Sequence, residues 1–314
     1  MAKATSYADD TRVIRSISCE KDVSSFQREL EKIYRWAEET KMVFNESKFE
    51  HMRYNSSDSI SNLFFPGYKT GDGSNIKTIC STKDLGILQS NGADYTEQIE
   101  TLKTKGRRMA GWILRTFKTR ERRPMLILFK SLVLPVVEYC SLVWSPGAIE
   151  KVREVESVQR SFTSNIIGLS DINYWDRLCV LDLYSLERRR ERFAILHVFK
   201  ILKGLAPNFE YESYKIVAYT HIRLGLLCRI PPLKSRASSR LKTLKDRSFS
   251  VIGPKLFNCA PAEVRNLEKS FDCFKNKVDK WLSGIPDRPC LNNYDPQNVQ
   301  SNSIISQIRN MQFS

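Results

Sequence analysis

Two adjacent carboxylates near the start of the chain have the type and spacing to do chemistry. Asp9 and Asp10 follow Tyr7 and Ala8 and precede Thr11. Two carboxylates on a tight turn between strands can hold a pair of divalent cations, which clamp the attacking and leaving oxygens of a phosphoryl transfer. Mg²⁺ takes one or two carboxylates together with substrate phosphate oxygens, so the pair suits a polymerase site. A turn or a helix N-cap without catalytic function uses the same residue types.

The segments after the carboxylates are predicted to form the strands and the helix that position them. The alternation over 12–17 indicates a half-buried strand. Asp22 or Ser24 is an N-cap candidate for an amphipathic helix that includes Trp36. A strand is expected near 49–52 and another at 84–88, with a polar loop or weak hairpin over 55–75. This part therefore reads as a small sheet with one helix.

From residue 94 the chain is predicted to be helical and strongly basic. Apolar residues recur at helical spacing through Phe117, and Trp112 and Phe117 are expected to pack in the core rather than to stack on bases. Acidic residues are nearly absent from 103–123, which favours contact with a phosphate backbone over an ordinary solvated face. The interleaved cations are Lys103, Lys105, Arg107, Arg108, Arg115, Lys118, Arg120, Arg122 and Arg123.

Composition points to a polyanionic partner. The 50 Lys and Arg against 35 Asp and Glu give a net charge of +15, which is typical of nucleic-acid binding. The eight cysteines lack C-x-x-C pairing, so they indicate reduced thiols, and with only three histidines no zinc site is expected. No signal peptide and no membrane partner are expected, which predicts an intracellular protein of the nucleus or cytoplasm. The oligomeric state is left open.

Short strings in a fixed order carry a resemblance to one family. They are YADDT at 7–11, N-x-x-K at 45–48, D-L-G-I at 84–87, F-K-S-L-V-L-P-V-V-E-Y at 129–139, V-W-S-P at 143–146, E-x-V-Q-R-S-F-T at 156–163, R-L-x-x-L-x-L-x-S-L-E-R-R-R at 177–190 and G-P-K-L-F-N at 253–258. The chain resembles the C-terminal half of the reverse transcriptase of a non-LTR retrotransposon, of the LINE type and jockey-like.

This resemblance implies an RNA-directed DNA polymerase, which is a nucleotidyltransferase. Its partners would be an RNA template, a DNA primer and a dNTP, and its cofactor in the full-length enzyme would be Mg²⁺ held by Asp9 and Asp10. Lys48 matches a palm lysine near the triphosphate, as a proton donor, as a phosphate counter-charge or as a plain surface lysine. The segment 85–87 (Leu85, Gly86, Ile87) resembles a primer grip, although Gly86 equally suits a turn.

The implied fold is α+β and mostly α-helical. It comprises a partial right-hand polymerase palm over 1–92 (a small antiparallel sheet plus a helix), a helical thumb over 93–207, a mixed and helical C-terminal module over 208–285 and a disordered tail over 286–314. Arg160 is expected to contact the duplex, as are the basic residues of the first thumb helix. The arginine run at 188–192 is either a phosphate grip or a set of ion pairs with Glu187 and Glu191.

The family supplies a further metal-binding carboxylate, the fingers and the nucleotide pocket upstream of its YADD motif. None of these is found in this sequence. We therefore expect no polymerase activity from this polypeptide alone. The alternative function is a non-catalytic, nucleic-acid-binding helical protein derived from such an element.

Overall fold

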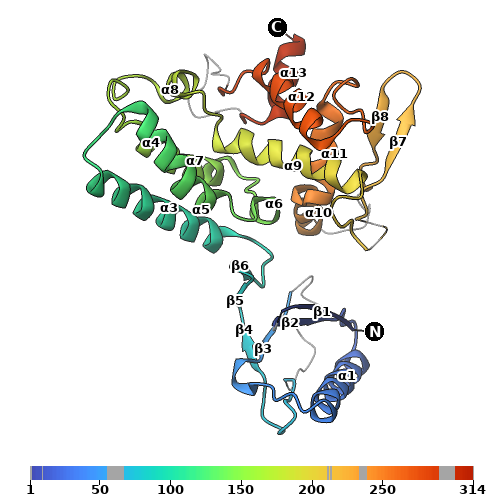
Figure 1. The fold of residues 1–314 in the computed structure, drawn as a ribbon. Coiled ribbons are helices and arrows are strands. Elements are labelled where there is room, and N and C mark those ends of the chain that lie inside the picture. Colours follow the sequence, from blue (N-terminus) through green and yellow to red (C-terminus); the bar gives the residue numbers. More distant parts are fainter. Residues whose placement is uncertain are drawn as a thin grey trace. The chain divides into compact units, whose positions relative to one another are not determined.

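The computed structural model describes residues 2–8, 10–54, 67–210, 212, 214–232, 239–289 and 301–313. It is a mixed α+β structure, about 53% helical with small two-stranded sheets, which confirms the predicted fold class at this level. The chain divides into two compact units, Met1–Asp94 and Tyr95–Ser314 (Figure 1). Across the described residues, no helix has both the length and the apolar character needed to cross a bilayer.

The described residues of the first unit form three two-stranded sheets: β1 pairs with β2 and β5 with β6 in antiparallel fashion, and β3 pairs with β4 in parallel. Its elements are β1 (Lys3–Tyr7), β2 (Asp10–Ile14), α1 (Glu20–Glu39), the 3₁₀-helix η1 (Glu46–Lys48), β3 (Glu50–Met52), β4 (Lys77–Ile79), β5 (Ser81–Asp84) and β6 (Ile87–Ser90).

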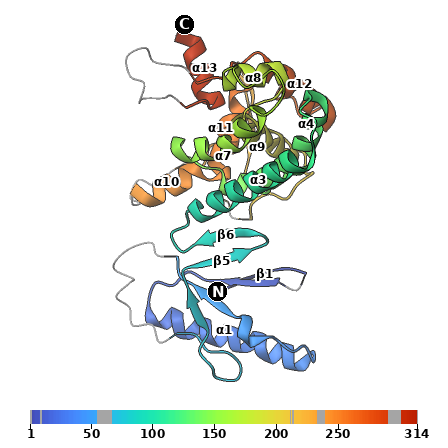
Figure 2. The same ribbon diagram turned by 90° about the vertical axis from the view of Figure 1, so that its left-hand side faces the viewer.

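Helix α1 holds the first hairpin in place. The Glu29 carboxylate accepts a hydrogen bond from the Ala2 N–H at 2.8 Å and another from Arg15 Nη1 at 2.8 Å. Ala2 precedes β1 and Arg15 follows β2, so the open end of the hairpin is tied to α1, which lies below β1 in Figure 2. The predicted N-cap is wrong. Cys19 is the N-cap, and Asp22 lies three residues into the helix, where its carboxylate accepts the N–H of Cys19 at 3.3 Å. This is the reciprocal half of a capping box.

The second unit is built almost entirely of helices. Its elements are α3 (Thr96–Thr116), α4 (Arg122–Leu128), the π-helix η2 (Phe129–Val133), α5 (Leu134–Glu138), α6 (Ser141–Trp144), α7 (Ile149–Thr163), α8 (Tyr174–Leu181), α9 (Leu186–Leu202), β7 (Ala218–His221), β8 (Gly225–Cys228), α10 (Ser239–Arg247), α11 (Phe249–Cys259), α12 (Phe271–Ser283) and α13 (Ile304–Phe313).

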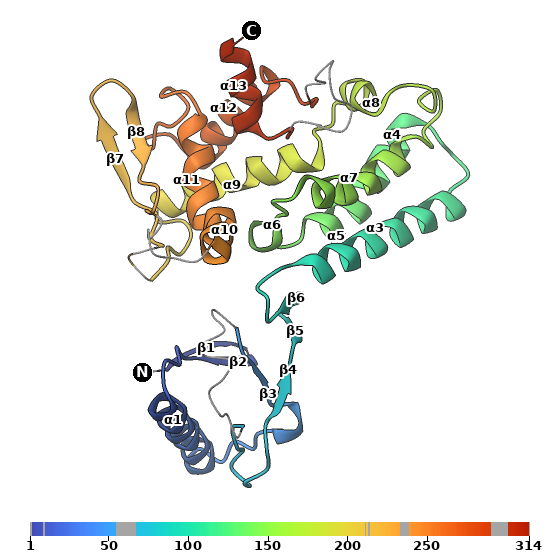
Figure 3. The same cartoon turned by 180° about the vertical axis from the view of Figure 1, so that it is seen from behind.

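Helix α3 packs along α5 and α7, as Figure 3 shows from behind. Gly106 makes the close approach possible, since it faces Val137 and Val158, which are both 1% exposed. Pro135 does not end its helix but follows η2 directly. Proline lacks an N–H and its ring crowds the preceding turn, and the wider π-helical turn accommodates both effects.

Helix α9 runs through the middle of the second unit, between the α3–α7 helices and the α11–α13 helices (Figure 1). Phe199 of α9 stacks on Phe274 of α12 with ring centroids 4.0 Å apart, and both rings are fully buried. The residues on either side of the expected thumb boundary at 207–208 therefore share one core.

A helix occupies part of the segment that the sequence predicts as a disordered tail. Ile304 at the start of α13 is fully buried, and its N–H donates to Glu191 Oε2 at 2.8 Å. Asn302 Nδ2 donates to Asp287 Oδ1 at 2.7 Å. The polar composition concealed the short apolar face of α13, which includes Ile308 and packs against the core of α9, α11 and α12.

Candidate nucleic-acid interface

The β1–β2 hairpin carries one of the two predicted carboxylates, Asp10, at its tip. Tyr7 of β1 pairs with Asp10 of β2, and Ala8 has a φ of 53°. Positive φ is typical of the tight turns that match strand twist. Asp10 is exposed and Tyr7 is 70% exposed, whereas Asp9 lies outside the described residues. The structure therefore shows a strand pair on either side of the motif.

The β5–β6 hairpin contacts the second strand of the first hairpin. Arg12 of β2 forms an ion pair with Asp84, which closes β5–β6 by pairing with Ile87. Leu85 and Gly86 form the two-residue turn, with φ of 44° and 86°. This geometry satisfies the turn-glycine alternative, because glycine adopts positive φ at no steric cost. Ile87 is buried and Leu85 is 46% exposed, so the three predicted primer-grip residues face different environments.

Lys48 ends the short helix η1 and has an exposed side chain. Its backbone N–H donates to Asn45 O at 3.0 Å, and Asn45 Oδ1 accepts the Ser47 hydroxyl at 2.6 Å. The N-x-x-K segment is thus a compact turn stabilised by its own asparagine. Within the described part of the chain no contact joins Lys48 to Asp10.

The hairpin tip fits Mg²⁺ only in part. Among the described residues, no group of three or more His, Cys, Asp or Glu side chains is positioned to hold a metal ion. Asp10 supplies one exposed carboxylate there. Such a donor suits Mg²⁺, which keeps several waters and takes its other ligands from substrate phosphates. The ion would therefore need Asp9 and nucleotide oxygens beside Asp10.

Four residues form an exposed cationic stripe along α3. Lys105, Arg108, Trp112 and Arg115, called the α3 stripe here, recur at intervals of three or four residues, so they share one face of the helix. Trp112 is 46% exposed and meets Phe117 edge to face at 6.1 Å. The core position expected for Trp112 is therefore wrong. Its ring lies on the solvent side of α3, because the opposite side already packs on α5 and α7.

Three other basic residues predicted for this surface, Lys103, Arg107 and Arg120, have partners within the protein. Lys103 pairs with Glu100 at 2.6 Å and with Glu154 at 3.0 Å, and Arg107 donates to Ser157 Oγ at 3.0 Å. These contacts tie α3 to α7. Arg120 donates to three backbone carbonyls near the end of α3, including Thr119 O at 2.9 Å, and so acts as a helix cap.

Arg160 is the predicted duplex contact on α7. Its side chain is exposed, and its guanidinium lies 4.8 Å from the centre of the buried Tyr174 ring. Tyr174 donates its hydroxyl to the buried carboxylate of Glu156, and burial raises the pKa of Glu156. The aromatic contact fixes Arg160 at the surface without neutralising its charge, which leaves it able to meet a phosphate.

The arginine run of α9 is used inside the protein. Arg188 is fully buried and donates to Pro286 O at 2.7 Å and to Ile285 O at 3.2 Å. Arg189 pairs with Glu138 at 2.9 Å. Arg190 is 4% exposed and lies over the Trp144 ring, and Arg192 pairs with Asp279 at 2.7 Å.

These contacts decide between the two alternatives for the run. The contacts favour ion pairing within the protein over a phosphate grip, because the guanidinium groups are turned inward. The partners are not the expected Glu187 and Glu191, since Arg189 and Arg192 pair with carboxylates of other helices. Burial raises the pKa of Glu187 to about 7 and that of Glu191 to about 8. Spacing along one helix could not have revealed partners that are distant in sequence.

Comparison of the chain with known protein families, curated proteins and solved structures finds no match. Function is therefore inferred from the residues of the chain itself.

Proposed function

We propose that this chain is part of an RNA-directed DNA polymerase of a mobile element and that its helical unit binds the template–primer through the α3 stripe. The observation that carries the proposal is the stripe itself, with three exposed cations and an exposed indole on one helical face. Lysine and arginine neutralise backbone phosphates, and an aromatic ring stacks on a base of any identity. The net charge of +15 favours the same partner.

The β1–β2 hairpin is assigned the chemistry of nucleotidyl transfer. Asp9 and Asp10 would hold Mg²⁺, which when bound with a dNTP would stabilise the charge that develops on the transferring phosphoryl group. Tyr7 would border the approach to the primer end. Lys48 would contribute positive charge to the triphosphate.

A non-catalytic nucleic-acid-binding protein is the second candidate. It is favoured by the observation that the α3 stripe needs neither a metal ion nor a nucleotide to bind a phosphate backbone. Lys105, Arg108 and Arg115 are exposed, and none of them has an ion-pair partner among the described residues. Both candidates therefore predict binding to nucleic acid, and only the polymerase predicts nucleotide incorporation.

Binding is tested by fluorescence anisotropy with a labelled RNA–DNA hybrid over a range of salt concentrations. Each phosphate contact contributes about 0.9 to the slope of log K against log salt. The double variant Arg108→Ala, Arg115→Ala is expected to lower the slope by about two, and Trp112→Ala to weaken binding to a single strand by ~1–3 kcal/mol. Arg153→Ala on α7 is the matched control, since Arg153 is exposed but lies off the stripe. An equal loss in the control would contradict the assignment.

Turnover is tested by primer extension on poly(rA)/oligo(dT) with Mg²⁺. The wild-type chain is compared with Asp9→Ala and with Asp10→Asn. Extension that disappears in both variants supports the polymerase. Binding without extension by any of the proteins is the result we expect of this polypeptide alone, and it supports the second candidate as the function of that polypeptide.

A further inference from the structure

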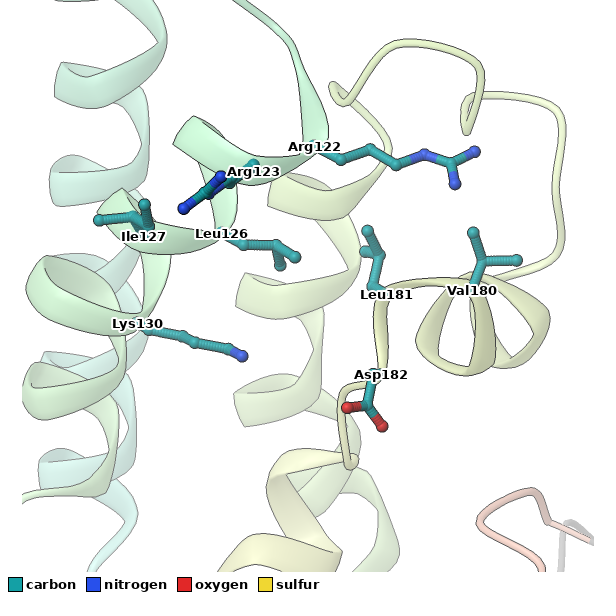
Figure 4. Close-up of a pocket in the computed structure, with 8 residues that line it drawn as sticks. All are labelled: Arg122, Arg123, Leu126, Ile127, Lys130, Val180, Leu181 and Asp182. Carbon is teal, nitrogen blue, oxygen red and sulfur yellow. The ribbon is translucent and has the colours of Figure 1, made fainter.

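A groove lies between α4 and η2 on one side and the C-terminal end of α8 on the other (Figure 4). Its volume is about 410 Å³, which falls within the range of ligand pockets. It is separate from the α3 stripe, because no residue of α3 lines it. The lining residues are Arg122, Arg123, Leu126, Ile127, Lys130, Val180, Leu181 and Asp182.

The groove combines a cationic edge with an aliphatic floor. Figure 4 shows Arg122 and Lys130 extending toward the end of α8, with Leu126 between them facing Leu181 and Val180. Val180 is 45% exposed, so part of this apolar surface meets water. Neither Arg122 nor Lys130 has a side-chain ion pair or hydrogen bond with another described residue. The groove therefore offers both unpaired positive charge and uncovered apolar area.

This combination favours an acidic peptide over a nucleic acid. Single-stranded nucleic acids are held by aromatic rings on which bases stack, and no aromatic side chain is among the described residues that line the groove. Asp182, with a φ of 49°, adds a carboxylate that can accept a peptide N–H. Carboxylates of a peptide can pair with arginine in two parallel hydrogen bonds. A bulky aliphatic side chain would cover the floor.

We propose that the α4–α8 groove binds a short acidic segment of a partner protein that carries a large apolar side chain between its carboxylates. The charged groups of the segment would meet Arg122 and Lys130. Its apolar side chain would lie against Leu126, Val180 and Leu181. This interaction goes beyond nucleic-acid binding and uses different residues, so it can fail or hold independently of the proposed function.

The test measures anisotropy of a short fluorescein-labelled peptide that alternates glutamate and leucine, added to the full chain. Lys130→Ala is expected to weaken binding about threefold, as for an exposed charge pair. Val180→Ser is expected to weaken it about fivefold through loss of apolar contact. Both side chains are exposed, and circular dichroism verifies that the variants fold. Arg153→Ala is the control for loss of a surface cation elsewhere and should leave binding unchanged.

Two further probes make the outcome decisive. A peptide with serine in place of leucine keeps the charge and should bind at least tenfold more weakly. A single-stranded RNA should not displace the leucine peptide. The proposal is overturned if the serine peptide binds equally well, if the two groove variants bind like the wild type, or if RNA displaces the peptide and loses affinity in the same variants.

Discussion

Replacing Gly106 by alanine is expected to destabilise the helical unit, whereas the same change at Gly111 of the same helix stabilises it. A Cβ at Gly106 would lie 2.7 Å from Val137 Cγ1 and 3.1 Å from Val158 Cγ1. Valine has few rotamers, and both valines are buried, so neither methyl group can turn away. At Gly111 the nearest atom is Arg115 Nη1 at 3.3 Å, at the end of a long exposed side chain that can move.

The two variants gain the same helix propensity, but only one of them overpacks the core. Alanine is favoured over glycine in a helix interior by about 1 kcal/mol at either position. Overpacking of a close-packed core costs ~1–3 kcal/mol and applies to Gly106 alone. Gly111→Ala should therefore raise the free energy of unfolding by about 1 kcal/mol. Gly106→Ala should lower it by up to ~2 kcal/mol, which leaves the variants ~1–3 kcal/mol apart.

The assay is urea unfolding followed by far-ultraviolet circular dichroism, which reports mainly on helices. A difference of 1 kcal/mol corresponds to about 2–4 °C in Tm for a unit of this size, so thermal melts provide a second measurement. Comparing the two alanine variants cancels the helix-propensity term. Equal stability of the two, or a more stable Gly106→Ala, would refute the close packing of α3 on α5 and α7.

Three further predictions concern buried charge and the turn near the candidate site. Arg188→Met should lower the unfolding free energy by about 3 kcal/mol, because the carbonyls of Ile285 and Pro286 lose their buried donor, and Arg189→Met, at a more exposed pair, should cost less in the same urea titration. Burial raises the pKa of Glu191 from 4.5 to about 8, so the folded state retains a proton that the unfolded chain loses. The unfolding free energy should then fall as pH rises from about 4.5 to about 8, and a slope unchanged by Glu191→Gln would exclude this residue. Gly86→Ala should cost about 1 kcal/mol at a φ of 86°, seen as faster hydrogen exchange in β5–β6.

Some of the candidate site could be predicted from the sequence because it depends on local rules. The strand β2 follows from the alternation that begins at Arg12, and α3 follows from its apolar period. The basic character of 103–123 is a property of composition. Periodicity also predicts which face of α3 carries the α3 stripe, once the apolar face is fixed. The same periodicity led us to expect Trp112 in the core. An aromatic residue fits the apolar spacing whether its ring is buried or exposed, so this expectation was wrong.

The sequence by itself determined a mostly helical α+β chain with a pair of adjacent carboxylates near its start and an excess of positive charge. Only the tertiary structure decided how those charges are used. It turned Arg188 inward to two carbonyls nearly a hundred residues away, left Arg108 and Arg115 in solvent, and placed Lys130 opposite the end of α8. The physical reason is that the role of a cation depends on its nearest acceptor. That acceptor is set by packing between distant helices and not by spacing along one of them.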